Sequence, residues 1–390
     1  MRPDEFTPEA PGRLVPSPLG YWTFEPAPLP PDLRFDLGLV RQLSEADRAL
    51  GELAGVGRRL PNPHLLIRPF IRREAVLSSR IEGTITRLDQ LFLFEAEPGE
   101  IAHPVDVAEV ANYVHALEDG LQRMADGLPL CWRLLRDVHA RLLQGVRGEN
   151  RRPGQFRNCD VLIGRSGQSW DEARFVPPAH TALDPMLRDL ERFLNAPGDL
   201  PVVVQLALAH YQFETLHPFR DGNGRLGRLL ITLMLCERRV LPLPLLYLSA
   251  FLERHSQDYK DGMLAVSRRG AWAEWIRFFA QGVAEQARDA VDRAAKLLDL
   301  WQDYRVRVRE VSQSSAPLQL VDELFAAPYL TITRAAEVLK VTFPTAQTGM
   351  KKLEELGMVR EITGQKRNRI YQAREILALL DALPANAATE

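Results

Sequence analysis

The sequence has 390 residues and a formal net charge of −2, and 46% of its residues are hydrophobic and 26% charged. This length allows two or three domains with at least one sizeable core, and the near-neutral charge excludes a general polyelectrolyte binder. The three cysteines are widely spaced and fit no metal-ligand pattern, which argues against a disulfide scaffold. The first residues lack the apolar core of a secretory signal, and the run "LLITLMLC" is too short to cross a bilayer. We therefore expect a cytoplasmic location and no membrane partner.

The chain begins with a proline-rich segment. Residues 1–36 contain nine prolines, which exclude long helices and central strands from this part of the chain. The aromatic residues Phe6, Tyr21, Trp22 and Phe24 favour an arm that lies on the protein surface over a free tail.

Apolar residues then recur at three- and four-residue spacing, which predicts a mainly helical protein. The run "LGLVRQLSEADRALGELAG" predicts a helix from about residue 36 to 60. The run "PNPHLLIRPFIRREAVLSSRIEG" predicts a loop and then a helix that ends at Gly83. Further helices are expected over 105–123, 130–143, 182–195, 202–215, 225–238, 258–267 and 272–301. The helix expected over 272–301 is long enough to be broken once.

One segment is different. The run "CDVLIGRSGQSWDEARFVPP" has short β-prone stretches at 161–163 and 174–176 around a centre rich in Gly, Ser and Asp. This pattern predicts a β-hairpin with a long loop.

The run "HPFRDGNGRLGRLL", from His217 to Leu230, precedes a helix that we expect to begin near Arg225. The first amides of a helix lack internal partners and, with the helix dipole, form an anion site that glycines allow an anion to approach. Arg225 and Arg228 are three residues apart, so we expect both on one helix face, where two guanidiniums would suit several phosphates. Each feature alone is typical of a turn or of solvent-facing arginines, but their conjunction within twelve residues favours a site.

Two more residues of this run carry chemistry. Asp221 beside an anion site indicates a divalent cation such as magnesium that bridges the carboxylate to phosphates. His217 has the reference pKa of about 6.5 that leaves an imidazole mostly neutral at cytosolic pH, as a general base must be.

The twelve residues from His217 to Arg228 resemble the complete signature of the Fic family. The resemblance implies a mostly α-helical core that transfers AMP from ATP to a protein hydroxyl. It implies that His217 deprotonates a Ser, Thr or Tyr of the target, that Asp221 holds Mg²⁺ and that Phe219 packs inward. The residues implied to contact the ATP phosphates are Gly222, Asn223, Gly224, Arg225 and, for the γ-phosphate, Arg228.

The resemblance extends to two other parts of the chain. The hairpin around 160–178 resembles the family's flap, which would hold the target backbone by strand addition; a plain surface hairpin is the alternative. Tyr259, in "LSAFLERHSQDYKDGM", would border the adenine, with simple core packing as its alternative.

The run "SSRIEGT" contains Ser78, Glu82 and Gly83. Glu82 is expected in the last turn of a helix, where the helix dipole disfavours an anion unless a cation compensates it. These residues are similar to the Fic inhibitory motif, and the resemblance implies that Glu82 pairs with Arg228 and keeps it from the γ-phosphate.

The last part of the chain predicts a separate domain. "TITRAAEVLKVTFPTAQTGMKKLEELG" predicts two helices joined by a turn, and "MVREITGQKRNRIYQ" predicts two strands, in the order of a winged helix-turn-helix. Residues 329–374 hold nine Lys or Arg against four Glu, which gives DNA contact a physical basis. A protein-interaction module of the same fold is the alternative.

The sequence therefore predicts three parts: an N-terminal arm and inhibitory helical region over 1–104, a Fic core over 105–305 and a winged helix domain over 306–390. The expected function is that of an autoinhibited protein adenylyltransferase that uses ATP and Mg²⁺. A DNA-binding regulator with a nucleotide-sensing core and a protein de-AMPylase are the alternatives. The expected partners are a target protein and DNA, and a homodimer is left open.

Overall fold

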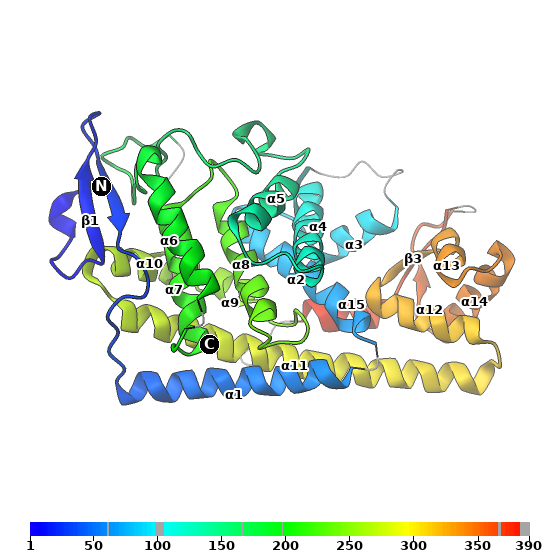
Figure 1. Ribbon diagram of the computed structural model, residues 1–390. Coiled ribbons are helices and arrows are strands. Elements are labelled where there is room, and N and C mark those ends of the chain that lie inside the picture. The colour runs from blue at the N-terminus through cyan, green and yellow to red at the C-terminus, as the bar shows by residue number, and fades with distance from the viewer. Residues whose placement is uncertain (61, 98–104, 165–166, 197, 366–367, 383–390) are drawn as a thin grey trace.

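The computed structural model in Figure 1 is mainly helical, as the sequence predicts. It describes residues 1–60, 62–97, 105–164, 167–196, 198–365 and 368–382. The helices are α1 (Leu37–Arg59), α2 (His64–Ile81), α3 (Leu88–Ala96), α4 (Val105–Ala125), α5 (Trp132–Leu142), α6 (Leu183–Asn195), α7 (Val202–Leu216), α8 (Asn223–Glu237), α9 (Ser249–Arg254), α10 (Ser256–Arg269), α11 (Trp272–Val311), α12 (Ser315–Ala326), α13 (Ile332–Leu339), α14 (Phe343–Glu355) and α15 (Arg374–Asp381). The strands are β1 (Gly12–Pro16), β2 (Trp22–Pro26), β3 (Tyr329–Thr331), β4 (Arg360–Glu361) and β5 (Ile370–Gln372).

Helices α7 and α8 form the centre of the protein. Nearly every residue of both helices is buried, because their apolar residues point in all directions and neighbouring helices cover every face. α2, α4 and α5 pack against α8, and α11 packs against α7, to which the Trp275 indole donates a hydrogen bond at the Ala207 carbonyl (2.9 Å). The central pair therefore gives its connecting loop a rigid support.

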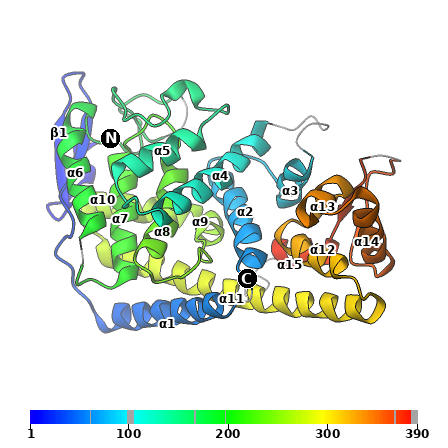
Figure 2. The same cartoon turned by 45° about the vertical axis from the view of Figure 1, so that its right-hand side comes forward.

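The longest helix, α11, runs along the base of the molecule with α1 beside it (Figures 1 and 2). Asp36 caps α1 by accepting a hydrogen bond from the Leu39 amide (2.8 Å), at the start that the sequence predicts. α11 continues unbroken to Val311, so the expected boundary at residue 306 falls inside it and the break left open in the sequence does not occur. The sequence prediction also missed α3 and α9, which have nine and six residues and are too short for a clear periodic pattern.

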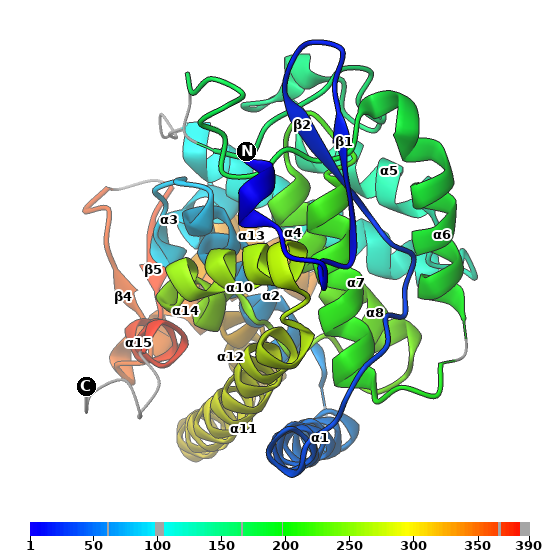
Figure 3. The same cartoon turned by 90° about the vertical axis from the view of Figure 1, so that its left-hand side faces the viewer.

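The proline-rich segment forms a short antiparallel hairpin, β1–β2, which the sequence did not predict (Figure 3). Pro16 and Pro26 lie at the ends of the two strands, so the hairpin accommodates residues that central strands exclude. Phe24 is fully buried in a small second core with Tyr21 and Phe175. The expectation that aromatic residues hold this segment on the protein surface is thus confirmed for Tyr21 and Phe24.

The C-terminal elements form a helix-turn-helix, α13–α14, followed by the antiparallel pair β4–β5. The three-stranded sheet has the order β3-β5-β4, in which β3 is a strand that the sequence did not predict. α12 packs against α2, where Arg68 lies 3.8 Å from Glu323. Within the described ranges, no helix is both long and apolar enough to cross a bilayer.

Candidate active site

The loop from His217 to Gly222 joins the end of α7 to the start of α8. Both ends are left-handed, with φ +48° at His217 and +75° at Gly222. α8 begins at Asn223, two residues before the predicted start, because Gly222 adopts the positive φ that lets the chain turn into the helix. The unpaired amides of the first turn of α8 therefore belong to the glycine-rich part of the motif.

Phe219 and Asn223 close this loop internally. The Asn223 side chain accepts a hydrogen bond from the Phe219 amide and donates one to the Phe219 carbonyl, both at 2.9 Å. The sequence assigned Asn223 to phosphate binding, but its side chain braces the loop and only its backbone amide remains suited to an anion. Phe219 is fully buried and stacks on the ring of His139 at 3.9 Å, in line with its expected inward packing.

His139, which the sequence analysis did not identify, supports the loop from α5. Its Nδ1 accepts a hydrogen bond from the Gly154 amide (2.8 Å), so Nε2 carries the proton that it shares with the Asp221 carbonyl (2.9 Å). Burial lowers the pKa of His139 to about 4, so the ring stays neutral and keeps this tautomer. No local sequence signal links His139 to the loop, since the contact depends on tertiary packing.

His217 is the first residue of the loop and caps the end of α7. Its Nδ1 is 3.3 Å from the Glu214 carbonyl, an acceptor, so Nε2 is the nitrogen left to take a proton. Burial, with the nearby charge of Arg157 adding to it, lowers the pKa of His217 to about 4. The imidazole is therefore neutral at physiological pH, which is the form that a general base requires.

Glu82, which follows the last residue of α2, forms an ion pair with Arg228 of α8. Glu82 Oε1 accepts a hydrogen bond from Arg228 Nη2 at 2.8 Å, and Arg228 also donates to the hydroxyl (2.8 Å) and carbonyl (2.9 Å) of Ser78. The ion pair expected from the inhibitory motif is thus present. α2 ends at Ile81, and Gly83 follows with φ +86°.

The Glu82 carboxylate also approaches the start of α8 closely. A Cβ atom on Gly224 would overlap Glu82 Oε1, so a larger residue would shift the carboxylate from this position. Burial raises the pKa of Glu82, but the charge of Arg228 and its hydrogen bond outweigh that effect and leave the pKa below its usual value. An ionised protein carboxylate therefore lies against the start of α8.

The comparisons with known proteins agree with this geometry. Two family models match the chain: "Fic/DOC family N-terminal" over residues 40–122 and "Fic/DOC family" over 129–235. The chain belongs to the Fic family.

Its relatives include proteins with adenylyltransferase names. A probable protein adenylyltransferase of Aquifex aeolicus is 34% identical over 174 residues, which are 44% of this chain and 49% of that protein. The protein adenylyltransferase Fic of Culex quinquefasciatus is 30% identical over 148 residues, 37% of this chain and 26% of that protein. The chain thus matches about a quarter to a half of the length of these relatives.

A solved Fic family protein from Desulfovibrio desulfuricans shares the fold. The TM-score is 0.57 at 20% sequence identity, and the match covers 88% of this chain and 98% of that one.

In this Fic protein, the Arg225 side chain has a partner that the sequence analysis did not identify. Its guanidinium is buried and donates to Glu109 of α4, and it lies 3.8 Å from Asp221. Arg228 donates to Ser78 of α2 and to Glu82 instead, so the two arginines have different partners. A buried carboxylate distant in sequence thus already pairs with the Arg225 side chain, and the expectation that Arg225 also contacts phosphate stays a prediction.

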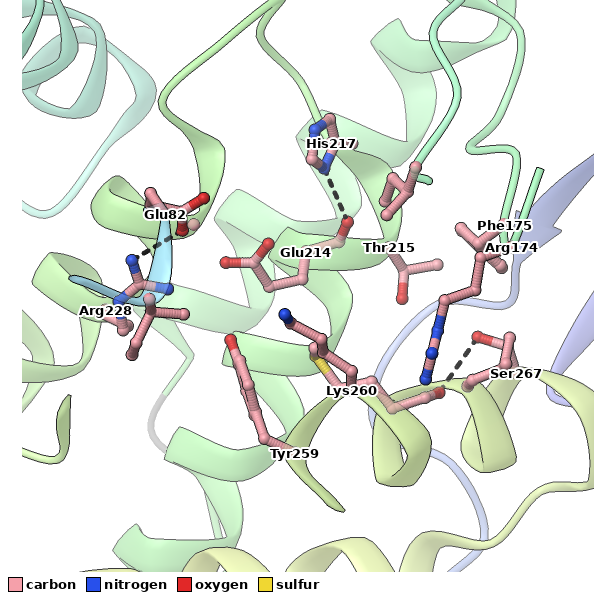
Figure 4. A pocket seen from close by; sticks show the side chains of 15 residues that line it. Glu82, Arg174, Phe175, Glu214, Thr215, His217, Arg228, Tyr259, Lys260 and Ser267 are labelled. Carbon is pink, nitrogen blue, oxygen red and sulfur yellow. Dashed lines mark hydrogen bonds and ion pairs between the residues drawn. The ribbon is translucent and has the colours of Figure 1, made fainter. Parts of the chain in front are cut away.

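A cavity of about 210 Å³ opens beside His217 (Figure 4). Its lining includes Glu82, Arg228 and Tyr259, so the structure places the expected adenine neighbour in the same cavity as the ion pair. Tyr259 is buried and its hydroxyl lies 2.7 Å from Nε2 of His210. The tyrosine is therefore held rigidly by the core while one side borders the cavity.

Glu214 is a second carboxyl group in this cavity and was not identified from the sequence. Among the described residues its Oε1 has no hydrogen-bond partner, and burial raises its pKa to about 8. A Cβ on Gly227 would lie 2.3 Å from this oxygen, so Gly227 provides the space for Glu214. The cavity thus combines one ionised carboxylate, Glu82, with one that is largely protonated at neutral pH.

Asp221 fits the role of a magnesium ligand only in part. Its carboxylate accepts a hydrogen bond from the Gly222 amide (2.7 Å), and its side chain is 37% exposed. Within the described part of the chain there is no cluster of three His, Cys, Asp or Glu that would hold a metal by itself. Magnesium is often bound by one or two carboxylates together with substrate phosphates, so Asp221 fits such a site when a nucleotide supplies the remaining ligands.

The flap predicted at 160–178 is less regular than a full hairpin, and residues 165–166 within it lie outside the described residues. Ile163 and Phe175 form one antiparallel bridge. The Ile163 amide nitrogen lies 2.8 Å from the Phe175 carbonyl oxygen, and the Phe175 amide nitrogen lies 3.1 Å from the Ile163 carbonyl oxygen. The Phe24 amide donates to the Val176 carbonyl (3.0 Å), so β2 lies along the other edge of this bridge. The N-terminal hairpin therefore supports the flap.

Proposed function

We propose that this protein transfers AMP from ATP to a hydroxyl of a target protein and that the conformation described is an inhibited one. The observation that carries the proposal is the Glu82 carboxylate, which lies against Gly224 and Arg228 within reach of a neutral His217. A site that stabilises a protein anion at a helix start would also bind the phosphates of a nucleotide. The adenylyltransferase names of the relatives support the reaction type.

Different residues of this chain would bind the phosphates, accept the proton and hold the metal ion. The amides of the first turn of α8 would bind the α- and β-phosphates, and Arg228 would bind the γ-phosphate. His217 would accept the proton of the target hydroxyl at Nε2 while the hydroxyl oxygen attacks the α-phosphorus. The bond to the β-phosphate breaks, and pyrophosphate leaves. Mg²⁺, held by Asp221 and the phosphates, would neutralise charge on the nucleotide.

The ion pair explains the inhibition. Arg228 cannot donate to Glu82 and to the γ-phosphate with the same Nη2 hydrogen bond, and the Glu82 carboxylate repels the phosphates from the start of α8. ATP would therefore bind weakly or with its α-phosphate misplaced relative to His217. Displacement of Glu82 would restore both contacts.

The target would dock on the flap. The bridge between Ile163 and Phe175 has one edge along β2, which leaves the edge at residues 161–163 for an added strand. An extended target segment there would lie next to the cavity, which Ile163 lines together with His217. A target Ser, Thr or Tyr would thus reach the imidazole.

Removal of AMP from a modified protein is the second candidate. Glu82 and His217 line the same cavity, so the carboxylate would be able to orient a water molecule for attack on the phosphorus. In that reaction Glu82 is required rather than inhibitory.

We also propose that the C-terminal domain binds DNA through α14. Its exposed residues include Thr345, Gln347, Thr348 and Lys351, which are able to donate hydrogen bonds to bases or phosphates. Lys366 and Arg367, which contribute to the basic excess of this region, lie outside the described residues. Binding to another protein through the same helix is the alternative.

One experiment tests the enzymatic proposals together. Wild type, Glu82→Gly and Glu82→Gln are incubated in a cell lysate with Mg²⁺ and ATP labelled at the α-phosphate, and labelled proteins are identified by mass. Labelling that increases in both variants supports inhibited transfer, and Glu82→Gly with His217→Ala is the control for catalysis. Loss of AMP removal from pre-labelled protein in both variants, without any gain in labelling, supports the second candidate instead.

A further inference from the structure

The Arg157 side chain connects the flap to the catalytic loop from a buried position. On the flap side, Nη1 donates to the Cys159 carbonyl (3.2 Å) and Nη2 to the Pro178 carbonyl. On the α7 side, Nε donates to the His217 carbonyl (2.9 Å) and Nη2 to the Leu216 carbonyl (3.3 Å). One guanidinium therefore holds both ends of the flap and the backbone of the catalytic histidine.

The backbone adds a fifth contact, since the Arg157 amide donates to the Pro218 carbonyl (2.9 Å). Leu216 is the last residue of α7 and His217 is its left-handed cap, so their carbonyls lie where a helix leaves acceptors without partners. The planar guanidinium of an arginine donates to several such acceptors in one fixed geometry, which the single ammonium of lysine cannot do.

No carboxylate in the described part of the chain forms a close ion pair with Arg157. The nearest, Asp160 Oδ1, lies at 3.9 Å and also accepts a hydrogen bond from the His180 amide (2.8 Å), while Asp160 Oδ2 accepts one from Tyr21 (2.7 Å). Burial lowers the pKa of Arg157 to about 10, which Asp160 only partly offsets. A buried cation that bonds mainly to carbonyls is costly, so its contribution lies in the geometry that it imposes.

The charge of Arg157 also reaches the imidazole. After burial, it is the next cause of the low pKa of His217. Arg157 therefore acts on His217 in two ways: its hydrogen bonds place the residue, and its charge helps to keep the ring neutral.

We propose that Arg157 is a positioning residue, which fixes the distance between a target strand docked on the flap and the imidazole of His217. The proposal rests on the proposed transfer reaction. Arg157 does not line the cavity and its side-chain hydrogen bonds go to carbonyls, so its loss would change the alignment of the hydroxyl and the base rather than the affinity for ATP. Misplacement of reacting groups by about 1 Å costs on the order of 100-fold in rate.

The test compares Arg157→Met and Arg157→Lys in the full-length Glu82→Gly protein. Arg157→Met removes both the charge and the planar guanidinium, whereas Arg157→Lys keeps the charge and removes the guanidinium. Arg192→Met, an exposed arginine of α6, is the matched control. The measurements are self-labelling and lysate labelling with ATP, ATP affinity by calorimetry, the His217 titration by NMR and hydrogen exchange of the Ile163 and Phe175 amides.

We expect both Arg157 variants to lower the transfer rate by about tenfold or more and to speed exchange of the flap amides, with ATP affinity unchanged within about twofold. The His217 pKa should rise in Arg157→Met and stay low in Arg157→Lys. If Arg157→Met does not fold, the transfer rate and the flap amide exchange of Arg157→Lys test the proposal on their own.

An Arg157→Lys protein with the rate and flap exchange of its Glu82→Gly parent would overturn the proposal. So would a loss of ATP affinity as large as the loss of rate, because the residue would then support the whole site. If Glu82→Gly itself transfers no AMP, the proposed function fails, and the His217 titration and the flap exchange still decide this inference.

Discussion

The Glu82 carboxylate and the Arg228 guanidinium form a 2.8 Å ion pair between the end of α2 and the start of α8. Arg228 is buried, whereas the Glu82 side chain is 36% exposed, so the carboxylate is the partner that can leave. The guanidinium keeps its bonds to Ser78 when Glu82 moves, and it would remain in place for a phosphate.

A double-mutant cycle should show that Glu82 acts through Arg228. Glu82→Gly should raise AMP transfer and self-labelling, and in an Arg228→Ala background the same change should have little further effect, since the γ-phosphate contact is already lost. Transfer rates of the wild type, both single variants and the double variant at fixed Mg²⁺ give the coupling. Equal activation in both backgrounds would show that the two residues act independently.

His217→Ala should abolish transfer without loss of the nucleotide site. Removal of a general base typically costs about 10²–10⁴ in rate, whereas the phosphates contact other groups, so ATP affinity should stay within a few fold. Single-turnover labelling and calorimetry in the Glu82→Gly background measure the two effects. A variant that keeps the full transfer rate would contradict the assigned base.

The pH dependence of transfer should lack the usual histidine step near 6.5. Because burial lowers the pKa of His217 to about 4, the neutral form predominates at pH 6 and is lost only as the pH falls through the folded value. The kcat/KM of Glu82→Gly for AMP transfer from ATP should therefore have no acid limb due to His217 between pH 8 and 6, with circular dichroism at each pH as the control for folding. A fall of tenfold between pH 7 and 5.5 in folded protein would show that the imidazole titrates normally.

Asn223→Ala should destabilise the loop. The variant leaves the buried amide and carbonyl of Phe219 without partners, at a cost of about 1–3 kcal/mol for each unsatisfied group. Urea unfolding of the variant should show a lower midpoint with an unchanged slope. Asn223→Asp keeps the acceptor and loses the donor, so its urea midpoint should lie between those of the wild type and Asn223→Ala.

DNA binding through α14 should depend on Lys351 more than on Lys352. Lys352 donates to the Val311 carbonyl at the end of α11 (2.8 Å), whereas the Lys351 side chain is 75% exposed beside Glu355. Lys351→Glu with Lys340→Glu should weaken binding to mixed duplexes in low salt, and the affinity of the wild type should fall steeply as salt rises. Absence of binding to a broad pool of duplexes would favour a protein partner.

The sequence predicted those parts of the protein that depend on short-range patterns. Helix periodicity located the long helices, and the run from His217 to Arg228 and the motif around Glu82 located the two halves of the candidate site. Contacts between distant segments left no such pattern. The pairing of Arg225 with Glu109, the support of the loop by His139 and the contacts of Arg157 became visible only when the segments were packed together.

The short β elements were harder to predict for a related reason. β1 and β2 have five residues each, and the small core around Phe24 joins residues of the N-terminal segment to Phe175 of the flap, which is distant in sequence. Local composition therefore suggested only an arm on the surface.

Glu82 belongs to the same chain as the proposed phosphate site, so under the proposed function it would compete with phosphate as an intramolecular ligand. A tethered group acts at an effective concentration that is on the order of millimolar even for flexible tethers, and α2 holds Glu82 more firmly than a flexible tether would. The fraction of molecules with a displaced Glu82 would then rise gradually with the ATP concentration around the protein. The ion pair would thus make the basal activity a graded function of nucleotide supply, without any separate signal.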